Sequence, residues 1–290
     1  NTYKDTKFSQ HNYRGVLEHA TGSGKTYTAL TALKAHLKSS GVGLILVPSS
    51  LLLKQWTEEV KDELPNATLL KAGDGNVKWR KSNRLSSFTA NDPKLGMRVV
   101  IATLQTASSD EFIKKMGQGT HVMVIGDECH QSGSQKNSKV YEIDAGKRLG
   151  LSATPRRYGD PEGTQQLFNY FGPVIDPIFT LNHAIKAGRL VRYDYFPHEI
   201  TLTPAEAEEW KEFSDKIKKA AARSPRDGNG KILPSNYLEI LTLNRARIAK
   251  KAARKSSLAT SIIRDEYLEG EKWLVYCEDQ HQLADVLRNL

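Results

Sequence analysis

The stretch Ala20-Thr21-Gly22-Ser23-Gly24-Lys25-Thr26 decides how the rest of this chain is interpreted. It follows a short apolar patch at residues 15–17 and opens a run of helical period that begins at Tyr27. A strand, a glycine loop, Lys-Thr and a helix are the layout of a phosphate-binding loop. The glycines let backbone N–H groups approach an anion, and the helix N-terminus adds partial positive charge. In such a loop Lys25 reaches the terminal phosphates and the Thr26 hydroxyl binds magnesium.

This stretch departs from the general phosphate-loop motif at one position. The motif places glycine six residues before the lysine, where this chain has His19. A Gly-Lys-Thr triplet alone is also typical of an ordinary turn that enters a helix. The choice between a phosphate-binding loop and an ordinary turn therefore depends on the rest of the sequence.

The composition limits the class of protein. The chain has 290 residues with 39% hydrophobic content, and no apolar run approaches the ~20 residues that span a bilayer. No secretory signal pattern opens it, and Cys129 and Cys277 are too few for a disulfide framework. These features predict a cytoplasmic or nucleoid-associated protein with no membrane partner. Because the first residue is Asn1 rather than methionine, we expect the chain to be part of a longer protein.

The charge balance favours a polyanionic partner. Lys and Arg together number 42 against 33 Asp and Glu, which gives a formal net charge of +9. A merely soluble basic surface has the same composition, so charge alone leaves both interpretations open. The same is true of the basic segment at residues 71–94 and of the basic cluster at residues 245–255, each of which suits a phosphate backbone or a solvated face.

Short apolar runs alternate with stretches of helical period along the first half of the chain. The runs predicted as strands are residues 43–47, 67–70, 98–102, 121–125 and 148–151, in addition to the patch before the glycine loop. Such alternation predicts an α/β fold in which a parallel sheet carries helices on both faces. Ligands bind such sheets at the carboxyl ends of the strands.

Polar residues follow five of the predicted strands at this edge. They are the glycine loop, Pro48 with Ser49, Thr103, Asp127 with Glu128, and Ser152 with Thr154. We therefore expect these residues to share one functional edge of the sheet.

Asp127 and Glu128 are the candidate catalytic carboxylates. Asp127 follows a buried strand downstream of a phosphate loop, where it can hold magnesium directly or through water. Glu128 can orient or deprotonate a water that attacks a phosphate. An isolated Asp-Glu pair is usually a surface loop, but this pair follows four apolar residues at the predicted ligand edge. Cys129 and His130 beside it lack the spacing of a zinc site.

Four segments resemble, in order and spacing, motifs I, Ia, II and III of superfamily 2 helicases and translocases. They are residues 20–26, 46–49, 127–130 and 151–155. Residues 127–130 are similar to a DEAD/DEAH-type box in its Asp-Glu-Cys-His form, and this superfamily does not require glycine at the place of His19. Three further phrases, at residues 151–157, 167–172 and 184–191, resemble the branch of XPB-like helicases and restriction-enzyme motor subunits.

The resemblance implies ATP and Mg²⁺ as cofactors. The nucleotide would be held by Thr21, Gly22, Ser23, Gly24, Lys25 and Thr26, and the metal by Thr26 and Asp127. Lys25, Asp127 and Glu128 would be the catalytic residues, with Glu128 activating water.

The resemblance also implies a coupling set and a nucleic-acid contact. His130, Ser152 and Thr154 would couple the nucleotide state to the nucleic acid. Pro48, Ser49 and Thr103 would contact nucleic-acid phosphates, which positions a strand without reading its sequence. For Ser49 and Thr103, helix capping or satisfaction of a strand end explains the residue nearly as well.

The expected organisation is a RecA-like P-loop NTPase domain at residues 1–200, a helical linker or insertion at residues 201–256 and the beginning of a second RecA-like domain at residues 257–290. Thr203 and Glu206 form a capping box that starts a helix, and a second helix is expected from Pro234. Residues 272–277 are predicted to be a buried strand, and Asp279 to cap a final helix.

The function expected from the resemblance is an ATP-dependent helicase or translocase, on DNA rather than RNA, of a repair, restriction or phage-defence type, with partner subunits. An ATP-gated nucleic-acid clamp without unwinding is the main alternative, and a small-molecule P-loop kinase is a third class. We find no convincing adenine-reading motif, and the arginines that stabilise the transition state are expected to lie outside this chain. These 290 residues alone are therefore expected to hydrolyse ATP poorly.

Overall fold

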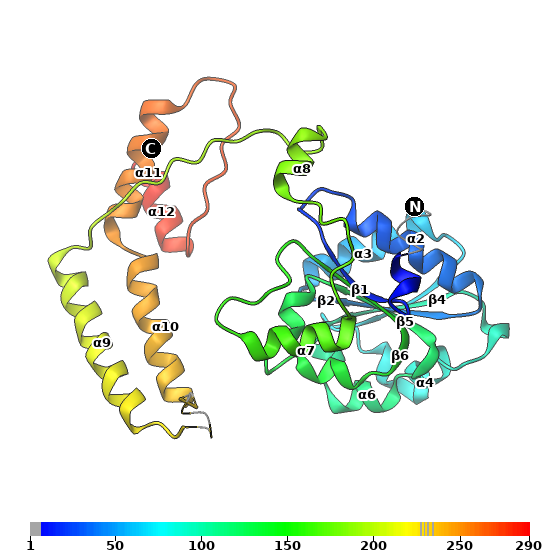
Figure 1. Cartoon of the computed structure of the whole chain (residues 1–290). Helices are drawn as coiled ribbons and strands as arrows, with labels where there is room; N and C mark the ends of the chain where they lie inside the picture. Colours follow the sequence, from blue (N-terminus) through cyan, green and yellow to red (C-terminus); the bar gives the residue numbers. More distant parts are fainter. Residues whose placement is uncertain (1–6, 227, 229, 231, 234) are drawn as a thin grey trace. The chain divides into compact units, whose positions relative to one another are not determined.

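The computed structural model describes residues 7–226, 228, 230, 232–233 and 235–290. The chain forms two compact units, Asn1–Tyr193 and Asp194–Leu290, and each is described by itself (Figure 1). No helix in the described part of the chain is long and apolar enough to cross a membrane.

The first unit is built on one sheet, in which six parallel strands are described. Along the sheet their order is β1-β6-β5-β2-β4-β3. Their bounds are β1 Arg14–Glu18, β2 Val42–Val47, β3 Thr68–Ala72, β4 Arg98–Thr103, β5 Gly119–Asp127 and β6 Ala145–Ser152. The parallel α/β sheet predicted from the sequence is confirmed.

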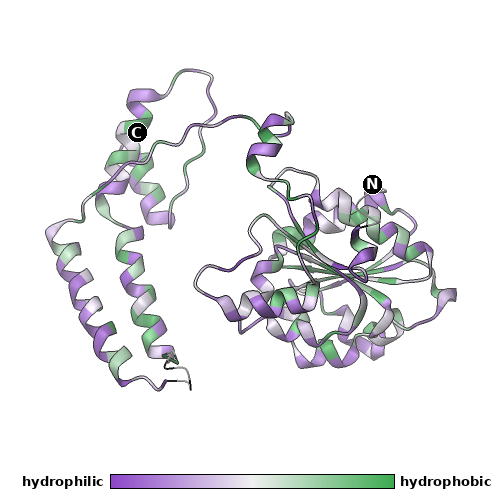
Figure 2. Ribbon diagram, viewed as in Figure 1, coloured by the Kyte–Doolittle hydropathy of each residue, from purple (hydrophilic) through white to green (hydrophobic). Residues whose placement is uncertain are grey.

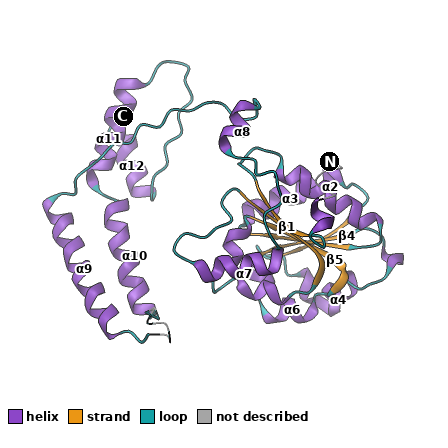
Figure 3. Ribbon diagram, viewed as in Figure 1, coloured by secondary structure: helices purple, strands orange, loops and turns teal. Residues whose placement is uncertain are grey.

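Helices cover both faces of this sheet (Figure 3). One face packs against α2 (Lys25–Lys38) and α3 (Ser50–Glu63). The other packs against α4 (Arg84–Phe88), α5 (Leu104–Ala107), α6 (Asp110–Lys115) and α7 (Pro161–Phe171). The connections contain η1 (Lys78–Asn83), η2 (Pro93–Leu95), η3 (Cys129–Gly133), η4 (Ser138–Glu142) and α8 (Leu181–Lys186).

Strand β2 shows why the sequences of the central strands are continuously apolar. All of its residues are buried, with Leu44 and Leu46 in one core cluster and Ile45 and Val47 in the other. Successive side chains of a strand point to opposite faces, and here both faces are covered by helices. Each position of the strand must therefore be apolar.

The register of the sheet brings the predicted site residues to one edge. Asp127 at the end of β5 pairs with Leu151 of β6, and Ser152 at the end of β6 pairs with Glu18 of β1. Thr103 at the end of β4 lies beside Val47 of β2. The carboxyl ends of β1, β6, β5, β2 and β4 thus form one continuous edge.

The regular elements described in the second unit are helices, joined by segments without regular structure. Its helices are α9 (Pro204–Arg223), α10 (Asn236–Lys250), α11 (Ala253–Glu266) and α12 (Gln280–Arg288). Thr203 and Glu206 form the predicted capping box of α9, and Figure 2 shows hydrophilic residues along most of that helix. The helix predicted from Pro234 begins at Asn236, and Pro234 itself lies outside the described residues.

The prediction of a buried strand at residues 272–277 is wrong. These residues have no regular structure, and Leu274 and Tyr276 are 77% and 88% exposed. A strand needs a hydrogen-bonding neighbour, and the described residues of this unit contain no other strand. Asp279 does cap α12 as predicted, because its side chain accepts from the Gln282 N–H at 2.9 Å.

Candidate active site

The glycine loop joins β1 to α2, and two of its glycines have the positive φ angles that glycine adopts without strain. Gly22 and Gly24 have φ angles of +75° and +85°, a region that side chains disfavour and glycine adopts freely. Gly24 is the N-cap of α2, so the loop turns directly into the start of this helix. The Ser23 hydroxyl oxygen is buried and has no hydrogen-bond partner among the described residues. The loop therefore has a polar interior that can receive an anion.

Lys25 lies at the centre of this site. Its Nζ donates to the backbone carbonyls of His19 and Ala20, at 2.9 and 3.2 Å. Burial lowers the pKa of Lys25, and the charges of Glu128 and Asp127 act in the opposite direction and raise it. The charge of the ammonium group therefore interacts favourably with the charges of the two carboxylates.

Asp127 is held in place by two donors. It is the last residue of β5 and is 9% exposed. Its Oδ2 accepts from Nε1 of Trp56 at 2.8 Å, and its Oδ1 accepts from the backbone N–H of Glu128 at 3.0 Å. The sequence predicted the place of Asp127 but gave no indication that Trp56 would contact it.

Glu128 turns the chain away from the strand. Its φ of +44° is left-handed, which is uncommon for a residue with a side chain and is often found at functional sites. The turn starts η3 and places Glu128 Oε2 3.4 Å from Nδ1 of His130. The two adjacent carboxylates thus acquire different surroundings, since Asp127 is tied to α3 and Glu128 faces His130.

A polar link joins this segment to the end of β6. His130 Nδ1 lies 3.0 Å from Oγ of Ser152, and the same hydroxyl oxygen accepts the backbone N–H of Thr154 at 3.1 Å. Ser152 is fully buried. The structure therefore brings the three predicted coupling residues His130, Ser152 and Thr154 together.

Arg157 reinforces this link from the following loop. Its guanidinium donates to the backbone carbonyl of His130 and pairs with Asp160 at 2.8 Å. Asp160 in turn caps α7 by accepting from the Gly163 N–H at 2.8 Å. The sequence included Arg157 only within a longer phrase, because nothing in its spacing indicates a backbone partner so far upstream in the chain.

The three predicted nucleic-acid contacts lie one or two strands away along the same edge. Ser49 Oγ accepts from the Leu52 N–H at 3.3 Å and caps α3. Thr103 caps α5 and lies 3.0 Å from the Thr106 hydroxyl. Pro48 is partly exposed beside Ser49. Both hydroxyls therefore have a local structural role, and contact with nucleic acid stays a prediction.

The donors present suit magnesium bound together with a nucleotide. No group of three or more His, Cys, Asp or Glu side chains that could hold a metal occurs among the described residues. Mg²⁺ commonly takes one or two protein oxygens and completes its shell with phosphates and water. The Asp127 carboxylate and the hydroxyl of Thr26, the second residue of α2, are oxygen donors of this kind.

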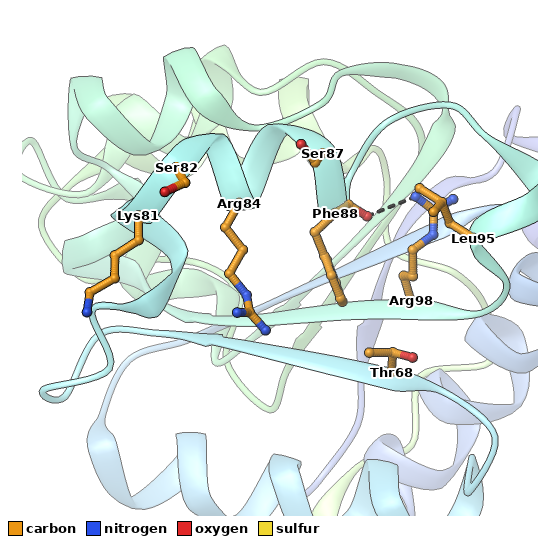
Figure 4. A pocket seen from close by; sticks show the side chains of 8 residues that line it. All are labelled: Thr68, Lys81, Ser82, Arg84, Ser87, Phe88, Leu95 and Arg98. Atoms are coloured by element: carbon orange, nitrogen blue, oxygen red, sulfur yellow. Dashed lines mark hydrogen bonds between the residues drawn. The ribbon is translucent and has the colours of Figure 1, made fainter.

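A separate pocket lies at the opposite edge of the sheet, where the basic segment of residues 71–94 folds back over β3. The cavity is about 540 Å³ and includes Thr68 and Arg98, the first residues of β3 and β4. Figure 4 shows Arg84 and Phe88 extending from α4 toward the strand that carries Thr68. Arg98 donates to backbone carbonyls of Phe88, Ala90 and Asp92, so its charge holds the loop together.

Two further residues of the basic segment, Trp79 and Arg80, are also engaged within the fold. Trp79 is buried against Phe112, and Arg80 pairs with Glu111 at 3.1 Å. The pocket thus lies at the amino ends of β3 and β4, and no residue of the glycine loop lines it.

Comparison with known proteins identifies relatives of this chain. The family described as "Type III restriction enzyme, res subunit" matches residues 2–157, which is more than half of the chain. A putative DNA 3'-5' helicase Rad25 of Haloarcula marismortui is 33% identical over 161 residues, covering 56% of this chain and 23% of that protein. A type I restriction enzyme EcoAI endonuclease subunit of Escherichia coli is 23% identical over 280 residues, or 92% of this chain and 30% of that protein.

Solved structures align with this chain at low identity. The Hef helicase domain of Pyrococcus furiosus aligns with 99% of this chain and 56% of that chain, with a TM-score of 0.48 and 19% identity. The matched stretch is about a quarter of the length of the first curated relatives.

Proposed function

Because this chain belongs to the type III restriction enzyme res subunit family, within the superfamily 2 helicase-type motors, we propose that it carries the ATP-binding part of a motor that moves along DNA. The observation that carries the proposal is the arrangement of the loop before Lys25, which follows β1, and of Asp127 and Glu128 at the end of β5, at the carboxyl edge of a parallel sheet. Parallel sheets bind their ligands at this edge. The activity, substrate and partners of the whole protein are part of the proposal.

The glycine loop and Lys25 hold the phosphates of ATP in this proposal. The backbone of residues 21–24 surrounds the phosphates, and the N-terminus of α2 adds partial positive charge. Lys25 exchanges its carbonyl partners, His19 and Ala20, for phosphate oxygens. The exchange is favourable because a charge-assisted bond to phosphate is stronger than a bond to a neutral carbonyl.

Thr26 and Asp127 hold the magnesium ion that accompanies ATP, and Glu128 prepares the attacking water. The ion neutralises charge that develops on the phosphates. A carboxylate within reach of that water accepts its proton as a general base. The different surroundings of Asp127 and Glu128 support this division of roles.

The link from Glu128 through His130 to Ser152 and Thr154 couples the nucleotide state to DNA. It joins the residue proposed to meet water to the end of the neighbouring strand β6 by contacts of 3.4, 3.0 and 3.1 Å. A change at the γ-phosphate can therefore reach β6 without a large movement. Pro48, Ser49 and Thr103 form the proposed DNA track along the same edge.

DNA is preferred to RNA as the substrate because more of the relatives have DNA-related names than RNA-related names. One relative is named a putative DNA helicase and another a restriction enzyme subunit. The division of the chain into a first RecA-like domain at residues 1–200, a helical insertion at 201–256 and the beginning of a second RecA-like domain at 257–290 is proposed on the same family grounds.

The Glu128→Gln variant tests the catalytic assignment. In the full-length protein we expect it to lower kcat for ATP hydrolysis by at least roughly 100-fold, the scale of general-base catalysis. Binding of MgATP should remain, because the phosphate loop is unchanged. Glu142→Gln, which alters an exposed glutamate of η4, is the matched control and should hydrolyse ATP at the wild-type rate.

ATP turnover with duplex DNA, with RNA and without nucleic acid completes the test. Stimulation by DNA together with strand displacement or translocation supports the motor. Hydrolysis without movement would favour an ATP-gated clamp, and turnover indifferent to nucleic acid would favour a kinase-like enzyme. An unchanged rate for Glu128→Gln would show that another residue is the base.

A further inference from the structure

Trp56 is the residue that connects α3 to the candidate metal carboxylate. Its indole Nε1 donates to Oδ2 of Asp127 at 2.8 Å, across the interface between the helix and the sheet. Trp56 is 1% exposed and Asp127 9%, so water does not compete for this bond. A hydrogen bond to a charged acceptor in a buried place is among the stronger ones in proteins.

The bond restricts Asp127 to one orientation. Oδ2 is engaged by Trp56 and Oδ1 by the Glu128 N–H at 3.0 Å. Rotation of the carboxylate would leave a buried donor without an acceptor, which costs free energy. The position of Trp56 therefore fixes the direction in which the free lone pairs of the Asp127 carboxylate point.

The same helix begins at the proposed DNA track. Ser49 is the N-cap of α3, and Trp56 follows it by about two helical turns, roughly 10 Å of axis. Residues seven positions apart lie on nearly the same side of a helix, and helical side chains lean toward the N-terminus. The indole of Trp56 thus reaches from the buried side of α3 toward the edge at which Ser49 lies.

Helix α3 can act as a single body that carries a displacement from one end to the other. Leu53, Trp56 and Val60 are fully buried or nearly so in one core cluster, which leaves the helix little freedom to bend. A shift of about 1 Å that draws the indole away from Asp127 along the bond would lengthen the 2.8 Å distance beyond that of a hydrogen bond. Small movements at Ser49 therefore change the restraint on Asp127.

We propose that Trp56 is a positioning residue that couples occupancy of the N-terminal end of α3 by a DNA phosphate to the presentation of Asp127 to MgATP. This coupling rests on the proposed function of the site. Coupling between binding sites is reciprocal, so MgATP must strengthen DNA binding by the same factor by which DNA strengthens MgATP binding. Loss of the indole N–H removes part of that factor in both directions.

The test measures the affinity of the full-length protein for a short fluorescein-labelled DNA duplex, with and without Mg²⁺ and a non-hydrolysable ATP analogue. The ratio of the two dissociation constants is the coupling factor. For Trp56→Phe we expect this factor to fall by roughly tenfold, near the lower end of the scale of one hydrogen bond to a charged group. DNA affinity without nucleotide should stay near that of the wild type.

Two further variants separate the hydrogen bond from packing. Replacement of Trp56 by 3-benzothienylalanine keeps the shape of the indole but has sulfur in place of the N–H, and it should lose coupling as Trp56→Phe does. Trp79→Phe is the matched control, because Trp79 is equally buried but belongs to the core cluster on the other face of the sheet. It should keep the wild-type coupling factor.

Failure of this inference differs from failure of the proposed function. If wild-type protein shows nucleotide-dependent DNA binding that Lys25→Ala abolishes, while the benzothienylalanine variant couples as the wild type does, the role of Trp56 is refuted and the motor stands. If Trp79→Phe lowers coupling as much as Trp56→Phe, the effect is one of general packing and the inference is also refuted. If wild-type binding ignores the nucleotide, the proposed function itself is contradicted.

Discussion

Gly126, the residue before Asp127, has no room for a side chain. A Cβ there would lie 2.6 Å from Cζ of Phe171 and 3.4 Å from Cβ of Cys129. Phe171 is fully buried at the end of α7, where it makes an edge contact with Tyr170. The strand that ends in the two carboxylates therefore packs directly on an aromatic ring, which holds their backbone in place.

Gly126→Ala is expected to reduce stability by about 1–3 kcal/mol, because the added methyl group overpacks the contact with Phe171. Urea denaturation measures the change in the free energy of unfolding. Gly228→Ala is the control, since a Cβ at Gly228 would meet nothing within 4 Å. Equal stability of the two variants would show that Phe171 moves aside without cost.

At the level of single residues, the sequence predicted where the candidate site residues lie better than it predicted which side chains they contact. It placed Lys25 in a loop that enters a helix, and Asp127 and Glu128 after a buried strand, and the structure has them in these places. Their catalytic roles stay predictions. The sequence did not find the partners of these residues, such as Trp56. A tryptophan on the apolar side of a helix reads as core, and only the fold shows which acceptor its N–H meets.

Helix α3 shows how one element can combine a structural and a proposed functional role. Its N-cap bond from Leu52 to Ser49 stabilises the helix, while its first turn faces the edge proposed to bind DNA. The two roles of Ser49 can be separated because α6 begins with an equivalent cap, Ser109, which accepts from the Phe112 N–H at 3.3 Å.

Ser49→Ala and Ser109→Ala should each lower the free energy of unfolding by about 1 kcal/mol, the usual cost of losing a serine cap. Only Ser49→Ala should also weaken DNA binding, by several-fold, in fluorescence anisotropy with a labelled duplex. If both variants bind DNA like the wild type, Ser49 is a helix cap and no more.

Residues 272–277 and strand β2 show why pattern alone cannot decide a strand. Both are runs rich in β-branched and large apolar residues, yet β2 is buried between β4 and β5 whereas Leu274 and Tyr276 are exposed. An apolar run of this kind favours burial. It can be buried as a strand only where a neighbouring strand completes the hydrogen bonds of its backbone. That neighbour is present for β2 and absent from the described residues of the second unit.

At the scale of the whole molecule, the two units differ in how much they bury. Both large core clusters consist of residues from the first unit. Among the described residues of the second unit the buried hydrophobic side chains are Leu241, Ala252 and Val286. Stability should therefore be unevenly distributed along the chain.

Hydrogen exchange followed by mass spectrometry should reveal this difference. We expect the amides of β2, β4 and β5 to exchange with the free energy of global unfolding, whereas those of α9 and α10 exchange through local opening at a much lower cost. MgATP should slow exchange in the glycine loop and in the turn at Glu128. Equal protection of both units would contradict the prediction.

The sequence by itself determined the class of fold and which polar residues follow its strands. Alternating apolar strands and helices require a parallel sheet, and the carboxyl ends of parallel strands meet at one edge. Tertiary structure alone decided the strand order and the absence of a strand at residues 272–277. It also decided two contacts, the bond from Trp56 to Asp127 and the bond from Arg157 to the His130 carbonyl. Periodicity records which face of an element is buried but not which neighbour covers it, and these four features depend on the neighbour.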